Sequence, residues 1–519
     1  MRLAWAAEVT GARIGQVAGV AILLALLAPL IALALRAEDW GGLTARDWAA
    51  IRFTLWQAAA SAALSVLLAV PVARALARRR FPGRDTVVLL LGAPFILPVI
   101  VAILGLVAVF GRGGPVALAF AWMGLDPPTI YGPQGVILAH VFFNLPLATR
   151  LILQGWLAMP GERLRLAASL GFRAGDTFRL LEWPMLRAVV PGIFVVIFLI
   201  CTTSFAVALA LGGGPRSTTV ELAIYQAFRF DFDLSRVAVL GAAQLVLAGL
   251  AAALSLRLAV PSAFGAGLDR AVPRWDSGGL GLRLQDGFAI TLACAFLLTP
   301  LSLMAAQGLP ALPDLPSTVW QAALRSLLVA VSAAVITTGL VIALSLAAIR
   351  MNGGWIEVVG TLSVAASPLV LGVGLYILLL PVADPVALAL PITAAINTIF
   401  ALPFALRAIL PAMRDLDRDF GRLSQTLGLS GWSWLRFVAL PRLRRPAGFA
   451  AGLAGALAAG DLGVITLFGA PDGATLPLVL YQLMGSYRLE EAKAAALVLI
   501  ALSLALFWAF EWGGRHHAA

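Results

Sequence analysis

The sequence predicts an all-α polytopic membrane protein with about 12 transmembrane helices, arranged as two tandem six-helix halves. Three observations support this fold class. Hydrophobic residues make up 61% of the 519 residues and charged residues only 12%, a balance that large soluble domains do not show. Twelve apolar segments are long enough to cross a bilayer, and one polar motif of the first half recurs in the second half.

A transmembrane helix needs about 20 apolar residues, and helices are expected because the bilayer core offers no partner for the open edge of a sheet. The segments of this length are 17–35, 53–76, 87–110, 135–153, 189–211, 237–258, 287–306, 319–348, 357–380, 386–410, 446–470 and 494–511. A stretch rich in Gly, Pro, Arg and Asp separates the sixth segment from the seventh. The predicted domains are a first half over 1–260, a cytoplasmic linker over 261–286 and a second half over 287–519.

The formal net charge of +11 indicates how the chain is oriented in the membrane, because basic residues favour the cytoplasmic side. With both termini in the cytoplasm, 27 of the 37 basic residues lie inside and ten outside, and the opposite orientation would reverse this ratio. The sequence therefore predicts a multi-pass protein with both termini cytoplasmic. Its partners include the lipid bilayer, and a nucleic acid is not expected.

The recurring motif lies between the fourth and fifth segments of each half. Residues 159–184 read MPGERLRLAASLGFRAGDTFRLLEWP, and residues 416–441 read LDRDFGRLSQTLGLSGWSWLRFVALP. Gly171 and Gly428 are 257 residues apart (428 − 171 = 257), and the other matched positions keep this offset. Two copies of one unit therefore follow each other in the chain.

Each copy predicts a short amphipathic helix at the cytoplasmic edge of the membrane. In the second copy, the apolar residues at i, i+4, i+7 and i+11 share one helix face; they are Leu416, Phe420, Leu423 and Leu427. At about 12 residues this helix cannot span a bilayer. Gly428, like Gly171, follows at the position where a helix end favours a positive φ.

This pattern resembles the cytoplasmic loop of ABC importer permeases, in which a short coupling helix, an LG pair and an F-x-x-V-x-LP run dock onto ATPase subunits. The matching residues are Leu170-Gly171, Phe178 and Trp183-Pro184, then Leu427-Gly428, Phe437 and Leu440-Pro441. The sequence departs from the family at a glutamate, whose position holds Arg165 and Arg422. A salt bridge through that glutamate is therefore not expected. The alternative is an interfacial helix without a partner.

The resemblance implies that each half is a type I ABC importer permease half. The ATPase-coupling residues that it implies are Arg165, Leu166, Ala167, Leu170, Gly171, Arg422, Leu423, Leu427 and Gly428. Longer runs, such as SFAVALALGGGPRSTTVELAIYQAFRFDFDLSR and TLPLVLYQLMGSYR, resemble the fused thiamine and thiamine pyrophosphate permeases of bacteria. That likeness implies thiamine import across the bacterial inner membrane by alternating access. It also implies two ATPase subunits and a periplasmic thiamine-binding protein as partners.

Few polar residues lie inside the apolar segments. Asp461 is the only acid in its segment, and a carboxylate at mid-bilayer costs about 2.5–3.5 kcal/mol on insertion scales. Its repeat equivalent is Ser204 (461 − 257 = 204). Asp461 either lines the translocation path, where it would favour the thiazolium of thiamine, or caps a broken helix. Asn144 is a third path candidate, although Asn144 and His140 more often satisfy backbone groups freed by Pro146.

No catalytic or metal-binding pattern is visible. Two of the three histidines lie in the C-terminal tail, and Cys201 and Cys294 lie in separate apolar segments. The only lysine is Lys493, preceded by Ala492, so the chain has no G-x-x-x-x-G-K-[ST] nucleotide loop. We expect a transport subunit and not an enzyme, without a cofactor or metal of its own, with ATP and Mg bound by the partner ATPase.

Two alternatives stay open. A ferric-iron-type fused ABC permease shares the layout and the cytoplasmic loop, but is not expected to carry the ELAIYQ and LYQLMGSYR runs. An ion-coupled secondary transporter can also consist of two parallel six-helix halves, but it would need charged relay pairs inside the spans. Among thiamine, its phosphate esters and another small cation, the sequence leaves the cargo open.

Overall fold

The computed structural model describes residues 2–37, 41–92, 96–258, 274–350, 355, 359–360, 362–363, 366–429, 431–468 and 473–515. Every regular element in these ranges is a helix, which confirms the all-α class. Eleven helical segments among the described residues are long and apolar enough to cross a membrane. They overlap all the predicted segments except 357–380, where a shorter apolar helix lies and where several residues are outside the described ranges.

The α-helices are α1 (Arg2–Arg36), α2 (Ala45–Arg78), α3 (Arg84–Leu90), α4 (Val99–Phe110), α5 (Pro115–Trp122), α6 (Pro133–Leu157), α7 (Gly161–Ser169), α8 (Ala174–Thr177), α9 (Trp183–Thr202), α10 (Ala206–Leu211), α11 (Val220–Gln226), α12 (Leu234–Arg257), α13 (Leu280–Gly308), α14 (Ser317–Arg350), α16 (Pro368–Leu379), α17 (Ala389–Thr426), α18 (Gly431–Trp434), α19 (Leu440–Ala459), α20 (Gly463–Phe468), α21 (Leu476–Gly485) and α22 (Leu489–Arg515). The π-helical turns are η2 (Phe178–Glu182), η4 (Ala227–Asp231) and η7 (Leu435–Ala439), and the 3-10 turns are η3 (Pro215–Ser217), η5 (Trp275–Ser277) and η6 (Leu309–Ala311).

Three of the predicted segments contain a break in the helix, although a candidate membrane span overlaps each of them. Segment 87–110 is divided into α3 and α4, because Pro98 precedes α4 and a proline without an N–H fits only at the start of a helix. Segments 189–211 and 446–470 are interrupted at 203–205 and at 460–462, between α9 and α10 and between α19 and α20.

The repeat seen in the sequence extends through consecutive elements. The elements α8, η2, α9 and α10 match α18, η7, α19 and α20 at the same offset of 257 residues (435 − 178 = 257). In α2 and α14 the offset is 272 (326 − 54 = 272). There Thr54 and Ser326 each accept a hydrogen bond of 2.9 Å from the first turn of a short helix, α11 or α21. The two halves therefore share their internal packing.

Each half contributes its first helix to the packing of the other half. The helix α1 packs against α14 and α16, and α13 packs against α2 and α4. A proline of the exchanged helix faces a glycine in both cases. A Cβ atom at Gly374 would lie 2.3 Å from the Pro29 carbonyl oxygen, and one at Gly105 would lie 3.0 Å from that of Pro300. The two halves follow each other in the sequence but are interlocked in space, because each one packs against the first helix of the other.

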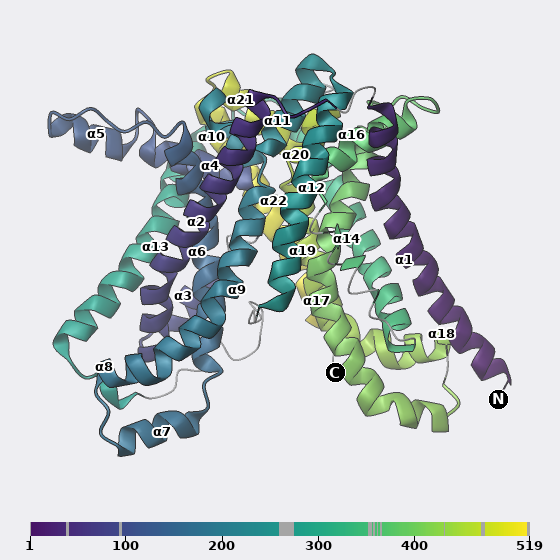
Figure 1. Cartoon of the computed structure of the whole chain (residues 1–519), viewed down its shortest axis with the longest axis horizontal. Helices are drawn as coiled ribbons and strands as arrows, with labels where there is room; N and C mark the ends of the chain where they lie inside the picture. The colour runs from purple at the N-terminus through teal and green to yellow at the C-terminus, as the bar shows by residue number, and fades with distance from the viewer. Residues whose placement is uncertain are drawn as a thin grey trace.

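Both copies of the motif lie at one edge of the helix bundle. Figure 1 shows α7, α8, α18 and the C-terminal end of α17 along its lower border, which we call the coupling edge. The helix α1 begins toward this edge. The short helices α10, α11, α20 and α21 gather at the opposite edge (Figure 1).

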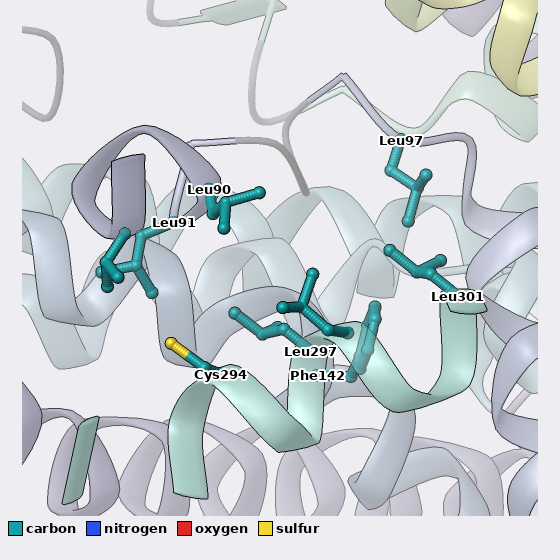
Figure 2. Close-up of a pocket in the computed structure, with 9 residues that line it drawn as sticks. Leu90, Leu91, Leu97, Phe142, Cys294, Leu297 and Leu301 are labelled. Carbon is teal, nitrogen blue, oxygen red and sulfur yellow. The ribbon is translucent and has the colours of Figure 1, made fainter. Parts of the chain in front are cut away.

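The contact between α13 and the first half leaves a small apolar pocket of about 50 Å³. In Figure 2, Cys294, Leu297 and Leu301 of α13 lie across it from Leu90 and Leu91. Its lining is almost wholly carbon and sulfur, so it offers no hydrogen bond to a ligand. Cys201 is buried and Cys294 is partly exposed, and neither cysteine has a disulfide partner among the described residues.

Candidate functional site

The coupling helices of both copies end in the same type of turn. Gly171 has a φ of 70° and Gly428 a φ of 69°, which confirms the predicted positive φ at both glycines. After the first glycine, the Phe172 N–H donates to the Ala167 carbonyl at 3.0 Å, and the second copy repeats this bond at 2.9 Å. These bonds satisfy carbonyls that the helix end would otherwise leave without partners.

The sequence predicts a separate short helix in the second copy as well. In the structure, the second coupling helix is instead the C-terminal end of the 38-residue α17. The cause is local. In the first copy Pro160 precedes α7 and separates it from α6, whereas the equivalent position in the second copy is Asp417 (160 + 257 = 417), which lets the helix continue.

Each coupling helix presents two leucines to the outside. The exposed fractions are 61% for Leu166 and 62% for Leu170, and 54% and 63% for their equivalents Leu423 and Leu427. Ala167, between the two leucines of the first copy, is 3% exposed. Apolar side chains that stand out at the same positions of both copies indicate a surface that a partner covers.

The two arginines at the position of the family's glutamate are on this surface. The Arg165 guanidinium lies 3.3 Å from the Glu162 carboxylate, and both side chains are about four-fifths exposed, so the pair contributes little to stability. Arg422 is exposed and has no carboxylate within salt-bridge distance among the described residues. The absence of a glutamate salt bridge at this position stays a prediction.

Glu182, near the end of the first coupling loop (residues 159–184), is the centre of a buried ionic cluster that the sequence did not predict. Its carboxylate is fully buried and lies 2.7 Å from the Arg74 guanidinium and 2.5 Å from that of Arg274. Arg274 also lies 2.6 Å from Asp276. Arg274 and Asp276 belong to the linker between the halves, so the linker is fixed to the first coupling loop. We call Arg74, Glu182, Arg274 and Asp276 the linker clamp.

The contacts within the linker clamp shift the pKa values of Asp276 and Arg274. Burial alone would raise the pKa of Asp276, but the hydrogen bonds and charge of Arg274 lower it below the ordinary value of 3.8. For Arg274, burial acts to lower the pKa, and the two carboxylates outweigh it and raise the pKa above its ordinary value. Both groups are therefore held in the charged form.

The second coupling loop lacks the central carboxylate of this clamp. Ala439 stands at the position of Glu182 (182 + 257 = 439), and α18 packs instead against α1. In the first loop, the Trp275 indole N–H also donates to the Phe172 carbonyl at 2.9 Å. The two coupling loops are therefore held by different means.

Asp461 lies in the turn between α19 and α20. Its carboxylate accepts hydrogen bonds from the Gly463 N–H at 3.1 Å and from the Asn397 side chain of α17 at 3.2 Å. This turn faces the first half, because a Cβ atom at Gly463 would lie 3.8 Å from the Phe205 ring. Asp461 therefore caps α20 and also lies at the contact between the halves.

The structure places the other path candidates differently. Ser204 lies in the equivalent turn between α9 and α10 and is partly exposed, beside Phe205. Asn144 is 3% exposed and donates hydrogen bonds to the His140 carbonyl at 2.8 Å and to the Cys201 sulfur at 3.3 Å. Since both hydrogen-bond partners of Asn144 belong to the first half, Asn144 has a role in packing, and Ser204 and Asp461 lie closer to the contact between the halves.

Aromatic rings gather at the contact between the two halves, close to these turns and toward the edge opposite to the coupling edge. The Phe228 ring lies 5.2 Å from that of Tyr376 in the other half, and the Phe205 ring lies 5.3 Å from that of Tyr225. Tyr376 also contacts Phe468 of α20, with ring centroids 6.3 Å apart. We call these five residues the aromatic seal. The sequence did not predict the aromatic seal, because the residues next to an aromatic ring in an apolar segment do not indicate which distant ring it contacts.

The described residues hold no group of three or more metal-ligating side chains. The arrangement consists of two matched apolar surfaces at one edge of the bundle and a contact between the two halves at the other edge.

Comparison with known proteins agrees with this arrangement. The chain is 41% identical over 481 residues to the thiamine transport system permease protein ThiP of Salmonella typhimurium, covering 90% of each chain. It is 40% identical over 492 residues to the protein of the same name from Brucella abortus, covering 92% of this chain and 90% of the relative. A sulfate transport system permease protein, CysW of Synechococcus elongatus, is 29% identical over 151 residues, or 27% of this chain. No protein-family model matches the chain.

Proposed function

Because the chain belongs to the family of thiamine transport system permease proteins, we propose that it forms the membrane path of an ATP-driven ABC importer for thiamine in the bacterial inner membrane. The coupling edge then faces the cytoplasm, together with both termini. The chain is a transport subunit, and a separate ATPase binds ATP and Mg.

The observation that carries this proposal is the matched pair of exposed leucines on each coupling helix. Two equivalent surfaces at one edge suit an ATPase dimer, because a symmetric dimer needs two sockets that face the same way. The partner complex is therefore two ATPase subunits on the coupling edge. A periplasmic thiamine-binding protein docks at the opposite edge, over the loops at 212–236 and 473–488.

The proposed mechanism is alternating access. Closure of the ATPase dimer on ATP draws the two coupling helices together and tilts the halves apart at the other edge. The aromatic seal then opens and admits thiamine to the contact between the halves, where Asp461 and Ser204 lie. ATP hydrolysis reverses the movement. Each ligand shifts this equilibrium only by its difference in affinity for the two states.

Reconstitution tests the proposed function. Vesicles with the chain, its ATPase subunits and the thiamine-binding protein should accumulate radiolabelled thiamine only when ATP is supplied. Competition with thiamine pyrophosphate would show whether phosphate esters are carried, and competition by ferric iron alone would contradict the cargo. Uptake by the chain alone in proton-loaded vesicles would contradict the ABC mechanism and support a secondary transporter.

The charge of Asp461 should matter separately from its capping role. In Asp461→Asn the side-chain oxygen can still accept the Gly463 N–H, so folding should be kept while the negative charge is lost. We expect thiamine uptake to fall about tenfold, the value of one charge-assisted hydrogen bond, with an unchanged unfolding temperature. Asp461→Ala should lose both uptake and stability. Unchanged uptake and substrate-stimulated ATPase activity in Asp461→Asn would remove Asp461 from the path.

A further inference from the structure

A groove of about 1240 Å³ opens at the edge opposite to the coupling edge, wholly within the first half. Its walls are the first turns of α2 and the segment from Gly214 to Asp231, which includes η3, α11 and η4. Neither Asp461 nor any member of the aromatic seal lines it. The groove therefore shares no lining residue with the aromatic seal or with Asp461, although one of its walls belongs to the loop 212–236, over which we propose that the thiamine-binding protein docks. We call it the rim groove.

The rim groove carries unbalanced positive charge. Its acid Asp231 lies 3.5 Å from Arg236, and Arg236 is also paired with Asp47 at 2.9 Å. Three further arginines line the groove and have no carboxylate within salt-bridge distance among the described residues. They are Arg46, Arg52 and Arg216. Such a groove favours an anion, because a guanidinium fork binds carboxylate or phosphate oxygens in pairs.

Arg52 lies on the face of α2 that is turned away from the protein. The exposed residues of this helix recur every three or four positions and include Trp48 at 58%, Trp56 at 53% and Leu67 at 69%. Arg52 is the charged member of this stripe, about 6 Å along the helix axis from each tryptophan. Tryptophans on a membrane-facing stripe are enriched at the level of the lipid headgroups. The rim groove therefore lies at that level.

The second half provides an internal comparison. With the offset of 272 given by Thr54 and Ser326, Trp48 corresponds to Trp320, which is 54% exposed. Arg52 then corresponds to Leu324, and Arg46 to Thr318. The equivalent stripe of α14 is apolar, with Leu324 58% exposed. The arginines of the rim groove are thus specific to the first half, and membrane insertion does not require them.

We propose that the rim groove binds the phosphate of an anionic phospholipid, in the leaflet at the edge opposite to the coupling edge. Arg46, Arg52 and Arg216 would contact the phosphate oxygens, and the acyl chains would follow the exposed stripe of α2 below Trp56. The position on a membrane-facing stripe favours a lipid over an acidic protein, which would reach the chain from the aqueous side. This inference does not depend on the identity of the transported cargo.

Lipid retention measured by native mass spectrometry tests the proposal. The purified full-length chain should retain phosphatidylglycerol after delipidation, and should bind it more tightly than phosphatidylethanolamine. The double variant Arg46→Thr/Arg52→Leu, which copies the second half, should weaken phosphatidylglycerol binding roughly 30-fold, since each arginine near an anionic membrane contributes a few-fold. Arg216→Ser, from the other wall, should give a smaller loss.

The control is Arg112→Thr, which removes an exposed charge at the same edge but outside the rim groove; it should leave binding unchanged. All the replaced side chains are exposed, and gel filtration and the unfolding temperature would verify that each variant is folded. Equal lipid retention in the double variant and the control would overturn the proposal. Displacement of the lipid by inorganic phosphate or thiamine pyrophosphate would assign the groove to a soluble phosphate instead. Weaker affinity for the thiamine-binding protein, with lipid retention unchanged, would assign it to an acidic protein surface.

Discussion

Replacement of Leu166 and Leu423 with aspartate should abolish ATP-driven uptake and release the ATPase subunits from the complex. These leucines hold equivalent positions on the two coupling helices, 61% and 54% exposed. Burial of one leucine in an interface contributes about 1.5–3 kcal/mol, and an unpaired aspartate in its place adds a desolvation cost. With both sockets altered, we expect ATPase co-purification to fall at least roughly 100-fold.

The single variants separate the two sockets. Leu166→Asp and Leu423→Asp should each weaken ATPase binding, and the double variant should lose more than either, because one bound dimer uses both sockets. The matched control is Leu125→Asp, at the end of α5, whose leucine is 54% exposed away from the coupling edge. It should keep its ATPase subunits. A double variant that co-purifies with the ATPase at the normal ratio would show that the coupling helices are not the docking surface.

The features that the sequence predicted well depend on neighbouring residues. The left-handed glycines are an example, because the apolar spacing before Gly171 and Gly428 marks a helix end within a few residues. The positions of the membrane segments are another, because length and apolarity alone identify a span. The repeat at 257 residues needs only a comparison of the chain with itself.

Features that depend on distant partners could not be predicted. The exchange of α1 and α13 between the halves leaves no local signal, because an apolar helix face suits lipid and protein alike. Arg74 and Arg274 were interpreted as charges that set topology, whereas both also bind Glu182, about a hundred residues from each. The positive-inside rule counts arginines without saying which acid each one meets.

The membrane-facing and interior sides of a helix are likewise hard to separate in this chain. Leu67 of α2 and Phe205 both lie within predicted apolar segments, yet Leu67 is 69% exposed and Phe205 is 7% exposed. Periodicity and composition describe the two segments alike. The difference arises from the partners, since Phe205 meets Tyr225 and the turn beside Asp461.

Replacement of Arg274 with methionine should destabilise the chain by about 3 kcal/mol or more, because it breaks a buried ion pair from one side. The Arg274 side chain is 3% exposed, and its removal leaves the buried Asp276 carboxylate without its ion-pair partner, while Glu182 keeps Arg74. The unfolding temperature should fall, and limited proteolysis should cut the first coupling loop near Phe172 sooner. Arg163→Met, an exposed change in α7, should change the stability by no more than about 0.5 kcal/mol.

A second substitution tests whether charge causes this loss. Adding Asp276→Asn to Arg274→Met removes the unpaired carboxylate and should restore part of the stability. The pH dependence has a definite sign. Because the pKa of Asp276 is lowered from 3.8 in the folded state, the stability from its pairing is fully present above 3.8 and is lost as the pH falls below that value. The effect of Arg274→Met should therefore be equal at pH 6 and pH 8. A loss that the second substitution does not relieve would mean that Arg274 acts by packing and not by its charge.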